Sequence, residues 1–123
     1  MAQRISAPEE SIPTFFSSEH SGRPHVEVDS QGYHLVVLER GDEISRKSST
    51  SMRDLLYWIF SSTTFLMAWE WELENRDEKE DFRRKLFSRQ IELMKLIDPE
   101  FGARREVEIE SILKKSPYAS NGA

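Results

Sequence analysis

The fold of this 123-residue chain is decided by one stretch, DLLYWIFSSTTFLMAWEW, which spans residues 54–71. It carries all three tryptophans, and its apolar residues recur every three or four positions, as on one face of an α-helix. Ser51 can cap the first turn of that helix, where the helix dipole also favours the carboxylate of Asp54. Ser and Thr at 61–64 are poor helix formers, so we expect a kink or break there. The stripe expected to face the core consists of Leu55, Ile59, Thr63, Leu66 and Leu73.

Strand patterns precede this helix. The segment HVEVD at 25–29 alternates, and YHLVVLER at 33–40 is the strongest strand signal of the chain. Its LVVL run lacks strict alternation, which predicts a middle strand covered on both faces. Residues 43–49 are polar and predict an edge strand. Gly32 and Gly41 supply the turns, so we expect three antiparallel strands joined by tight connections.

Two further helices follow the aromatic one. The first runs from about Asp81 to Ile97, and Asp98-Pro99 gives a cap followed by proline at the first position of a helix that ends near Lys115. Strands first and helices after predict an α+β fold, with a small antiparallel sheet of about three strands and three helices packed on one face. We expect one domain over 13–115, a disordered N-terminus over 1–12 and a flexible tail over 116–123. The residues expected in the core include Leu35, Val37, Trp58, Phe60, Leu66, Leu86 and Leu93.

Composition restricts the class of protein. Hydrophobic residues make up 37% of the chain and charged residues 32%, which suits one small domain with a modest core. The net charge of −5 argues against a nucleic-acid partner, because phosphate contacts need clustered Lys and Arg. The absence of cysteine excludes a disulfide framework and a thiolate metal site. Residues 1–12 show no signal-peptide pattern, and the apolar run at 55–69 is too short and polar to span a bilayer. We therefore expect a soluble cytoplasmic protein.

Catalytic patterns are weak. His25, Glu27 and Asp29 alternate on one face of a predicted strand and could suggest a metal site, but strand spacing holds them apart and favours a solvated face. Asp29 and Glu39 resemble a pair of nuclease carboxylates, yet Gly41 stands where that chemistry needs lysine. No Gly-x-Ser-x-Gly turn or glycine-rich phosphate loop is present. We expect no catalytic residues, no cofactor and no bound metal, because no nucleophile, base and orienting group are arranged together.

Charge is separated along the chain. Residues 70–81 are strongly acidic, and the stretch from Arg83 to Lys95 is basic. Neighbouring pairs such as Asp81 with Lys85 could neutralise each other as a solvated surface. The same acids could instead meet a basic partner, with two tryptophans framing the patch unless both pack inward. The candidate partner-binding residues are Glu70, Glu72, Glu74, Asp77, Glu78, Asp81, Trp69 and Trp71.

Several spaced blocks together resemble the immunity protein 63 family. They are GYHLVVLERG (32–41), DLLYWIF (54–60), FLMAWEWELENR (65–76), DFRRKLFSRQIEL (81–93), DPEF (98–101) and KSPY (115–118). The resemblance runs from about Arg23 to Tyr118 and leaves out residues 1–20; the position of Phe101 is often tryptophan in that family. It implies an α+β fold and the binding and neutralisation of a bacterial polymorphic toxin whose gene lies beside that of the immunity protein. The acidic patch would face a basic surface of such a toxin, so we expect a nuclease-type effector as the partner. A small regulatory or scaffolding subunit is the alternative, and the oligomeric state stays open.

Overall fold

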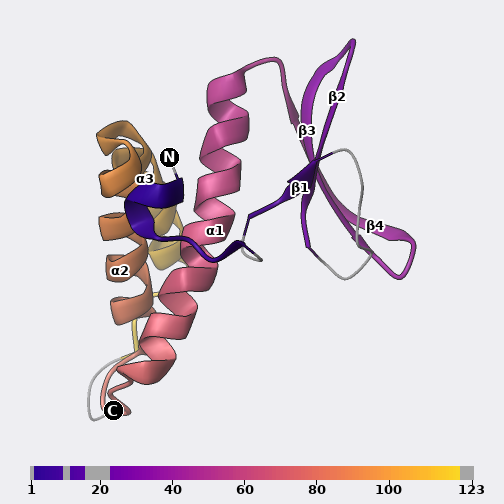
Figure 1. The fold of residues 1–123 in the computed structure, drawn as a ribbon. Helices are drawn as coiled ribbons and strands as arrows, with labels where there is room; N and C mark the ends of the chain where they lie inside the picture. Colours follow the sequence, from indigo (N-terminus) through magenta and orange to yellow (C-terminus); the bar gives the residue numbers. More distant parts are fainter. Residues whose placement is uncertain (1, 10–11, 16–22, 120–123) are drawn as a thin grey trace. The chain divides into compact units, whose positions relative to one another are not determined.

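The computed structural model describes residues 2–9, 12–15 and 23–119 of the chain (Figure 1). A three-stranded antiparallel sheet is followed by three helices, so the predicted α+β fold is confirmed. The elements are η1 (Ala2–Ile5), β1 (Thr14–Phe15), β2 (His25–Asp29), β3 (Gly32–Glu39), β4 (Asp42–Ser49), α1 (Met52–Glu74), α2 (Phe82–Ile97) and α3 (Pro99–Lys115). None of the helices in these described residues is long and apolar enough to cross a membrane.

Contacts group the described chain into two units, where the sequence predicted one domain. The first is formed by Pro8–Ser62 and the second by Met1–Ala7 with Thr63–Ala123. The helix α1 contributes to both units: its residues up to Ser62 belong to the sheet unit, and its residues from Thr63 belong to the helical unit.

The sheet unit has the strand order β1-β2-β3-β4. The short strand β1, which the sequence did not predict, pairs parallel to β2, and the other two pairings are antiparallel. β3 lies in the middle as expected, with His34, Leu35 and Val36 buried. Arg40 (φ 53°) and Gly41 (φ 86°) both take the left-handed conformation, and Glu39 pairs with Asp42 around them. This is the geometry of a two-residue hairpin turn, whose twist matches that of the strands it joins.

The core of the sheet unit joins the sheet to the start of α1. Val26 and Leu35 pack with Leu55 and Ile59, and Tyr33 and Trp58 lie against this cluster. The Ser51 hydroxyl accepts a hydrogen bond from the Asp54 N–H at 3.3 Å, which confirms the predicted cap.

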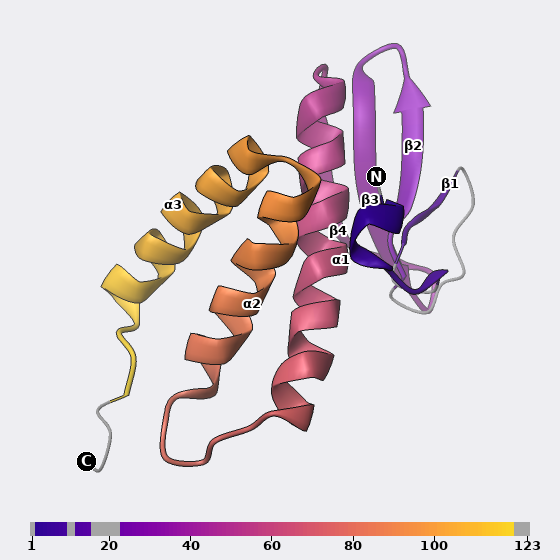
Figure 2. The ribbon, with the colours of Figure 1, turned by 60° about the vertical axis from the view of Figure 1, so that its left-hand side comes forward.

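The helical unit packs α2 between the second half of α1 and α3, as Figure 2 shows. Its core contains Ala68 from α1, Leu86 and Phe87 from α2 and Ile109 from α3. Asp81 and Asp98 cap α2 and α3 through the N–H groups of Arg83 (3.0 Å) and Glu100 (2.9 Å), and Pro99 begins α3 as predicted.

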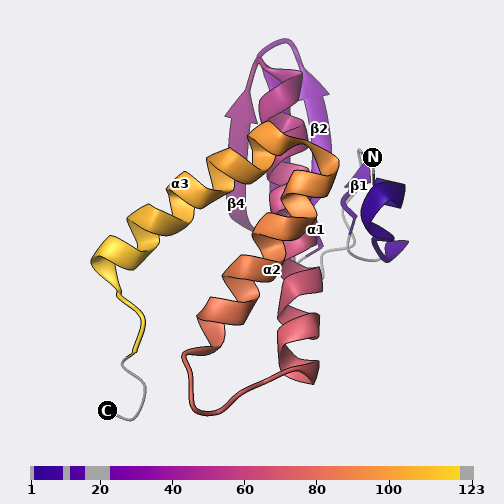
Figure 3. The same cartoon turned by 90° about the vertical axis from the view of Figure 1, so that its left-hand side faces the viewer.

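The break considered at 61–64 is wrong, because α1 runs as one helix from Met52 to Glu74 (Figure 3). Thr63 and Thr64 are fully buried, and the Thr64 hydroxyl accepts a hydrogen bond from Gln90 Nε2 at 3.3 Å. Packing and hydrogen bonding across the helices outweigh the poor intrinsic propensity of these residues.

The predicted core is confirmed in part. Leu35, Phe60, Leu86 and Leu93 are buried, whereas Trp58 and Val37 are only half-buried. Leu66 and Leu73 are exposed, so the predicted stripe is wrong in the second half of α1. The residues that the helix buries there are Thr63, Thr64, Ala68 and Glu72, so Thr63 is the one member of the predicted stripe that is buried in this half.

The two ends of the described chain have contacts that the sequence did not predict. Ile5 is buried, and Arg4 Nη1 donates a hydrogen bond to the Ile97 carbonyl oxygen at 3.0 Å, whereas residues 1–12 were expected to be disordered. Only one apolar side chain, Ile5, and one arginine, Arg4, make these contacts. They stand in a segment of mixed Ala, Ser, Pro and Glu that shows no periodic pattern, so the sequence did not indicate them. Residues 116–119 also bind the helical unit. The last four residues of the expected tail lie outside the described residues.

Candidate partner-binding surface

The strand histidines form ordered pairs. His25 Nε2 lies 2.6 Å from Glu27 Oε2, and His34 Nε2 lies 2.8 Å from Asp29 Oδ1. The solvated face expected for this strand is wrong for His25, which is only 3% exposed. Cross-strand register explains this, because His25 lies opposite Val36 in the buried centre of the sheet. Within the described residues, no group of three or more His, Cys, Asp or Glu side chains could hold a metal ion.

One chain of hydrogen bonds does bring together a nucleophile type, a base and a carboxylate. Besides Asp29, His34 contacts Ser48, whose Oγ lies 2.6 Å from His34 Nδ1. The expectation that no such groups are arranged together is therefore wrong in its geometry. The hydrogen bond to His34 lowers the pKa of the Asp29 carboxyl, with help from the Gln31 N–H. Asp29 and Ser48 also provide hydrogen-bond partners for both ring nitrogens of the buried His34. Buried polar groups generally have such partners, so these contacts have a structural explanation.

The acidic end of α1 carries an exposed apolar surface. Leu66, Trp69, Leu73 and Phe82 are exposed by 46, 41, 51 and 41%. The Trp69 ring contacts the Phe82 ring edge-on at 6.0 Å between centroids. We name this surface the acidic ridge and define it by Leu66, Trp69, Leu73 and Phe82 with the exposed acids Glu70, Glu74, Asp77 and Glu78.

Two predicted members of the acidic patch do not belong to the ridge. Glu72 is only 2% exposed, and its carboxylate accepts two hydrogen bonds from Arg76, from Nε and Nη2, each 2.9 Å long. This contact raises the pKa of Arg76. Asp81 is also engaged, because it caps α2 and pairs with Arg83. The spacing of the acids among themselves did not distinguish these two from the exposed acids around them, whereas the position of Arg76, four residues after Glu72, is a signal for that one pair.

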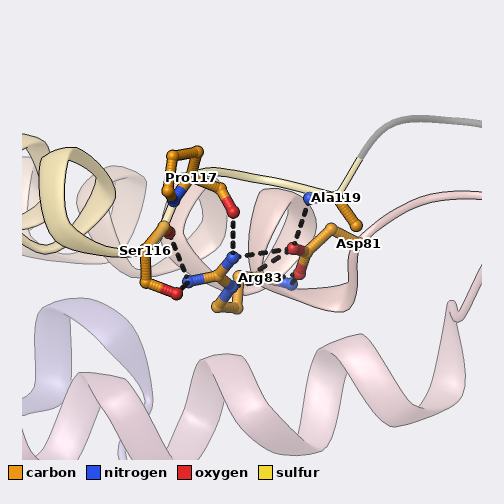
Figure 4. A network of polar contacts seen from close by, with 5 residues as sticks. All are labelled: Asp81, Arg83, Ser116, Pro117 and Ala119. Atoms are coloured by element: carbon orange, nitrogen blue, oxygen red, sulfur yellow. Dashed lines mark hydrogen bonds and ion pairs between the residues drawn. The ribbon is translucent and has the colours of Figure 1, made fainter.

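Asp81 and Arg83 form a clamp on the C-terminal segment, shown in Figure 4. Arg83 donates to the carbonyl oxygens of Ser116 and Pro117, each at 2.9 Å, and the Ala119 N–H donates to Asp81 Oδ2 at 3.0 Å. The hydrogen bonds from the Arg83 side chain hold the pKa of the Asp81 carboxyl well below its usual range. The hydrogen bonds that this carboxyl accepts from the backbone N–H groups of Arg83 and Ala119 lower this pKa further. Tyr118 packs against the helical core, and this burial raises the pKa of its hydroxyl.

The two tryptophans of the predicted patch have different surroundings. Trp69 belongs to the ridge, whereas Trp71 is half-buried and carries the Arg89 guanidinium 5.2 Å above its ring centre. Beside Trp71 lies a shallow hollow of about 260 Å³, which we name the basic hollow. Its lining is formed by Trp71, Arg84, Lys85, Ser88, Arg89 and Glu92.

The sequence model of one family, immunity protein 63, matches residues 29–111, which is more than half of the chain. The chain belongs to the immunity protein 63 family. No curated protein and no solved structure matches it significantly. Membership in the immunity protein 63 family implies a role in immunity against a toxin. The match contains the whole of the acidic ridge and the basic hollow, whereas residues 116–119 of the clamp lie beyond it.

Proposed function

We propose that this protein neutralises its toxin by direct binding, and that the acidic ridge covers the toxin's active or substrate-binding surface. The observation that carries this proposal is an exposed apolar strip bordered by acids on one helix end. Isolated exposed apolar residues are ordinary on a soluble protein, whereas contiguous ones bordered by polar groups are typical of binding surfaces.

The apolar part of the ridge has the composition of an interface centre. Leu66, Trp69 and Leu73 follow one another at spacings of three and four, so they adjoin on the surface of α1. Phe82 extends the strip from the start of α2 through its ring contact with Trp69. An aromatic side chain among apolar neighbours is the usual location of a binding hot spot.

The charged part of the ridge indicates the character of the partner. Arg76 pairs with the buried Glu72, lies 5.7 Å from the Phe82 ring centre and also interacts electrostatically with Glu78, so it offsets part of the charge of the ridge. The four exposed acids Glu70, Glu74, Asp77 and Glu78 outnumber this shared cation and leave a negative local field. A basic surface complements this field, and nucleases have such a surface where they bind phosphates. Complementary charge also accelerates association, which suits an inhibitor that must act before its toxin does.

The proposal includes the absence of catalysis. We interpret the contacts of Asp29, His34 and Ser48 as structural, because all three lie on neighbouring strands and satisfy the buried ring of His34. We further propose that the protein acts in the cytoplasm of the toxin-producing cell, without nucleic acid or membrane as partners.

Charge reversal of the ridge tests this function. The variant E70K/E74K/D77K should fold as the wild type does but associate at least about tenfold more slowly, at low salt, with the toxin domain encoded beside this chain. The matched control is E39K/D42K/E110K, which reverses three exposed acids outside the ridge. Binding is followed by stopped-flow fluorescence and protection by co-expression in bacteria. Wild-type association of the ridge variant would refute this interface, and failure of the wild type to bind would favour the regulatory or scaffolding alternative.

A further inference from the structure

We infer that the basic hollow is a second contact site for the same toxin and binds a carboxylate side chain of it. This inference rests on the proposed function but concerns different residues and the opposite charge. The hollow shares no residue with the ridge, and family membership assigns it no role.

The lining of the hollow comes from one face of α2. Arg84, Lys85, Ser88, Arg89 and Glu92 are spaced by one, three, one and three positions, so they line one side of that helix. Trp71 of α1 closes the opposite side. A volume of about 260 Å³ is below the range of pockets that enclose a whole small-molecule ligand. It suits one or two side chains of a docked protein.

Charge in the hollow favours an anion. Its lining contains three cations and one acid, Glu92, on a chain whose net charge is −5. Glu92 takes up only part of this charge, since its carboxylate lies 3.5 Å from Arg89 Nη1. The net charge of the hollow is thus positive, whereas the net charge of the whole chain is negative.

The cations are held in place by contacts that leave hydrogen-bond donors available. Arg89 lies over the Trp71 ring at 5.2 Å, and Arg84 lies over the Tyr118 ring at 4.3 Å. A guanidinium that contacts an aromatic face keeps the N–H groups along its edge for other acceptors. Lys85 Nζ donates to the Asn75 carbonyl oxygen at 2.5 Å and has two further N–H donors. The order already imposed on these side chains reduces the entropy lost on binding.

A protein carboxylate fits this site better than a nucleic acid does. Arginine binds carboxylates through two parallel hydrogen bonds, and tryptophan and arginine are the residues most enriched in protein hot spots. A nucleic acid would bring a row of phosphates toward a helical unit that also carries the ridge acids, which repel it. A single carboxylate experiences less of that repulsion.

The hollow and the ridge adjoin on α1. Glu74 of the ridge lies four positions after Glu70 and three after Trp71, so it neighbours both on the helix surface. One partner could therefore contact both sites, with a basic area on the ridge and an acidic side chain in the hollow. Such a pair of opposite charges fixes the orientation of the partner and excludes uniformly basic proteins.

Two experiments test the inference. In the first, S88E places a carboxylate within the hollow and R84Q/R89Q removes two of its cations. Each should weaken binding to the neighbouring-gene toxin domain at least about tenfold, mainly through faster dissociation. The matched controls are S88A and K114Q/K115Q, which should bind as the wild type does. Wild-type affinity of S88E would overturn the inference. If S88E binds as the wild type does while E70K/E74K/D77K still associates slowly, the proposed function stands and only the hollow is refuted. If E70K/E74K/D77K associates as the wild type does while S88E binds weakly, only the ridge is refuted.

The second experiment needs no toxin. The indole N–H resonance of Trp71, assigned with W71F, should shift when acetyl-(Glu)4-amide is added to the full chain, and the shift should be absent in S88E. Acetyl-(Lys)4-amide is the control and should leave the resonance in place. A shift with inorganic phosphate but none with the glutamate peptide would refute carboxylate binding.

Discussion

Replacing Asp81 with alanine should lower the free energy of unfolding of the helical unit by about 2–4 kcal/mol. Asp81 caps α2 through the Arg83 N–H at 3.0 Å, and loss of an aspartate cap costs about 0.5–2 kcal/mol. Its carboxylate also accepts hydrogen bonds from Arg83 Nη2 at 2.8 Å and the Ala119 N–H at 3.0 Å. Hydrogen bonds to charged groups contribute about 1.5–3 kcal/mol each. The cost of losing the cap and the cost of losing these hydrogen bonds do not simply add, because all of them share one carboxylate. In D81A, Arg83 also keeps its hydrogen bonds to the Ser116 and Pro117 carbonyl oxygens, which limits the loss.

The cost of D81A should depend on pH with a definite sign. The folded-state pKa of Asp81 is depressed, chiefly by the hydrogen bonds from Arg83, whereas the unfolded value is about 3.9. The carboxylate therefore stabilises the folded state fully above about pH 5, and this contribution is lost as pH falls through the unfolded and then the folded pKa. The difference in stability between the wild type and D81A should shrink as pH is lowered from 7 to 3.

Urea unfolding followed by far-UV circular dichroism measures this cost at each pH. D81S should recover the part that belongs to the cap, and E74A, which removes an exposed acid, should stay within about 0.5 kcal/mol of the wild type. Truncation after Lys115 tests the clamp, because D81A should cost less in a chain that lacks the Ala119 contact. A D81A cost below about 0.5 kcal/mol, or an equal cost in D81S, would contradict this reasoning.

Two further predictions concern the core and the histidine contacts. L86A should cost about 2–5 kcal/mol in urea unfolding, because Leu86 is 1% exposed, whereas L66A should stay within about 0.5 kcal/mol. A similar loss in both variants would show that the two leucines are buried alike. Ser48 should resist labelling by a fluorophosphonate probe, and EDTA should leave the melting temperature unchanged, as measured by mass spectrometry and calorimetry. Labelling of the wild type that is lost in H34A would instead show that Asp29, His34 and Ser48 form a catalytic triad.

The elements that the sequence predicted well carry their signals locally. Asp98 before Pro99 begins α3 because a cap and a fixed φ act within one turn, whatever lies beyond. The turn at Arg40-Gly41 and the middle position of β3 likewise follow from neighbouring residues. The parallel strand β1 was not predicted, because a strand of two residues is too short to show the alternation of apolar and polar residues.

The buried face of α1 could not be predicted from its own residues. Apolar spacing favoured Leu66 and Leu73, whereas the helix buries Thr64 and Glu72. Polar residues are tolerated there because each finds a hydrogen-bond partner, and for Thr64 that partner is Gln90, which lies 26 positions away. Hydrophobic periodicity contains no information about such distant partners.

The acidic patch shows how much of a binding surface can be predicted from charge alone. Glu72 has Arg76 four positions later, an arrangement that favours an ion pair on a helix, and this pair removes it from the patch. Glu70 has Glu74 at the same distance and the exposed leucines 66 and 73 on either side, so its neighbours leave its charge uncompensated. The distinction between a structural acid and one available to a partner was therefore present in the spacing of the cations. What spacing does not reveal is that Trp69 and Trp71 serve different surfaces, because that depends on Phe82 and Arg89 of the next helix.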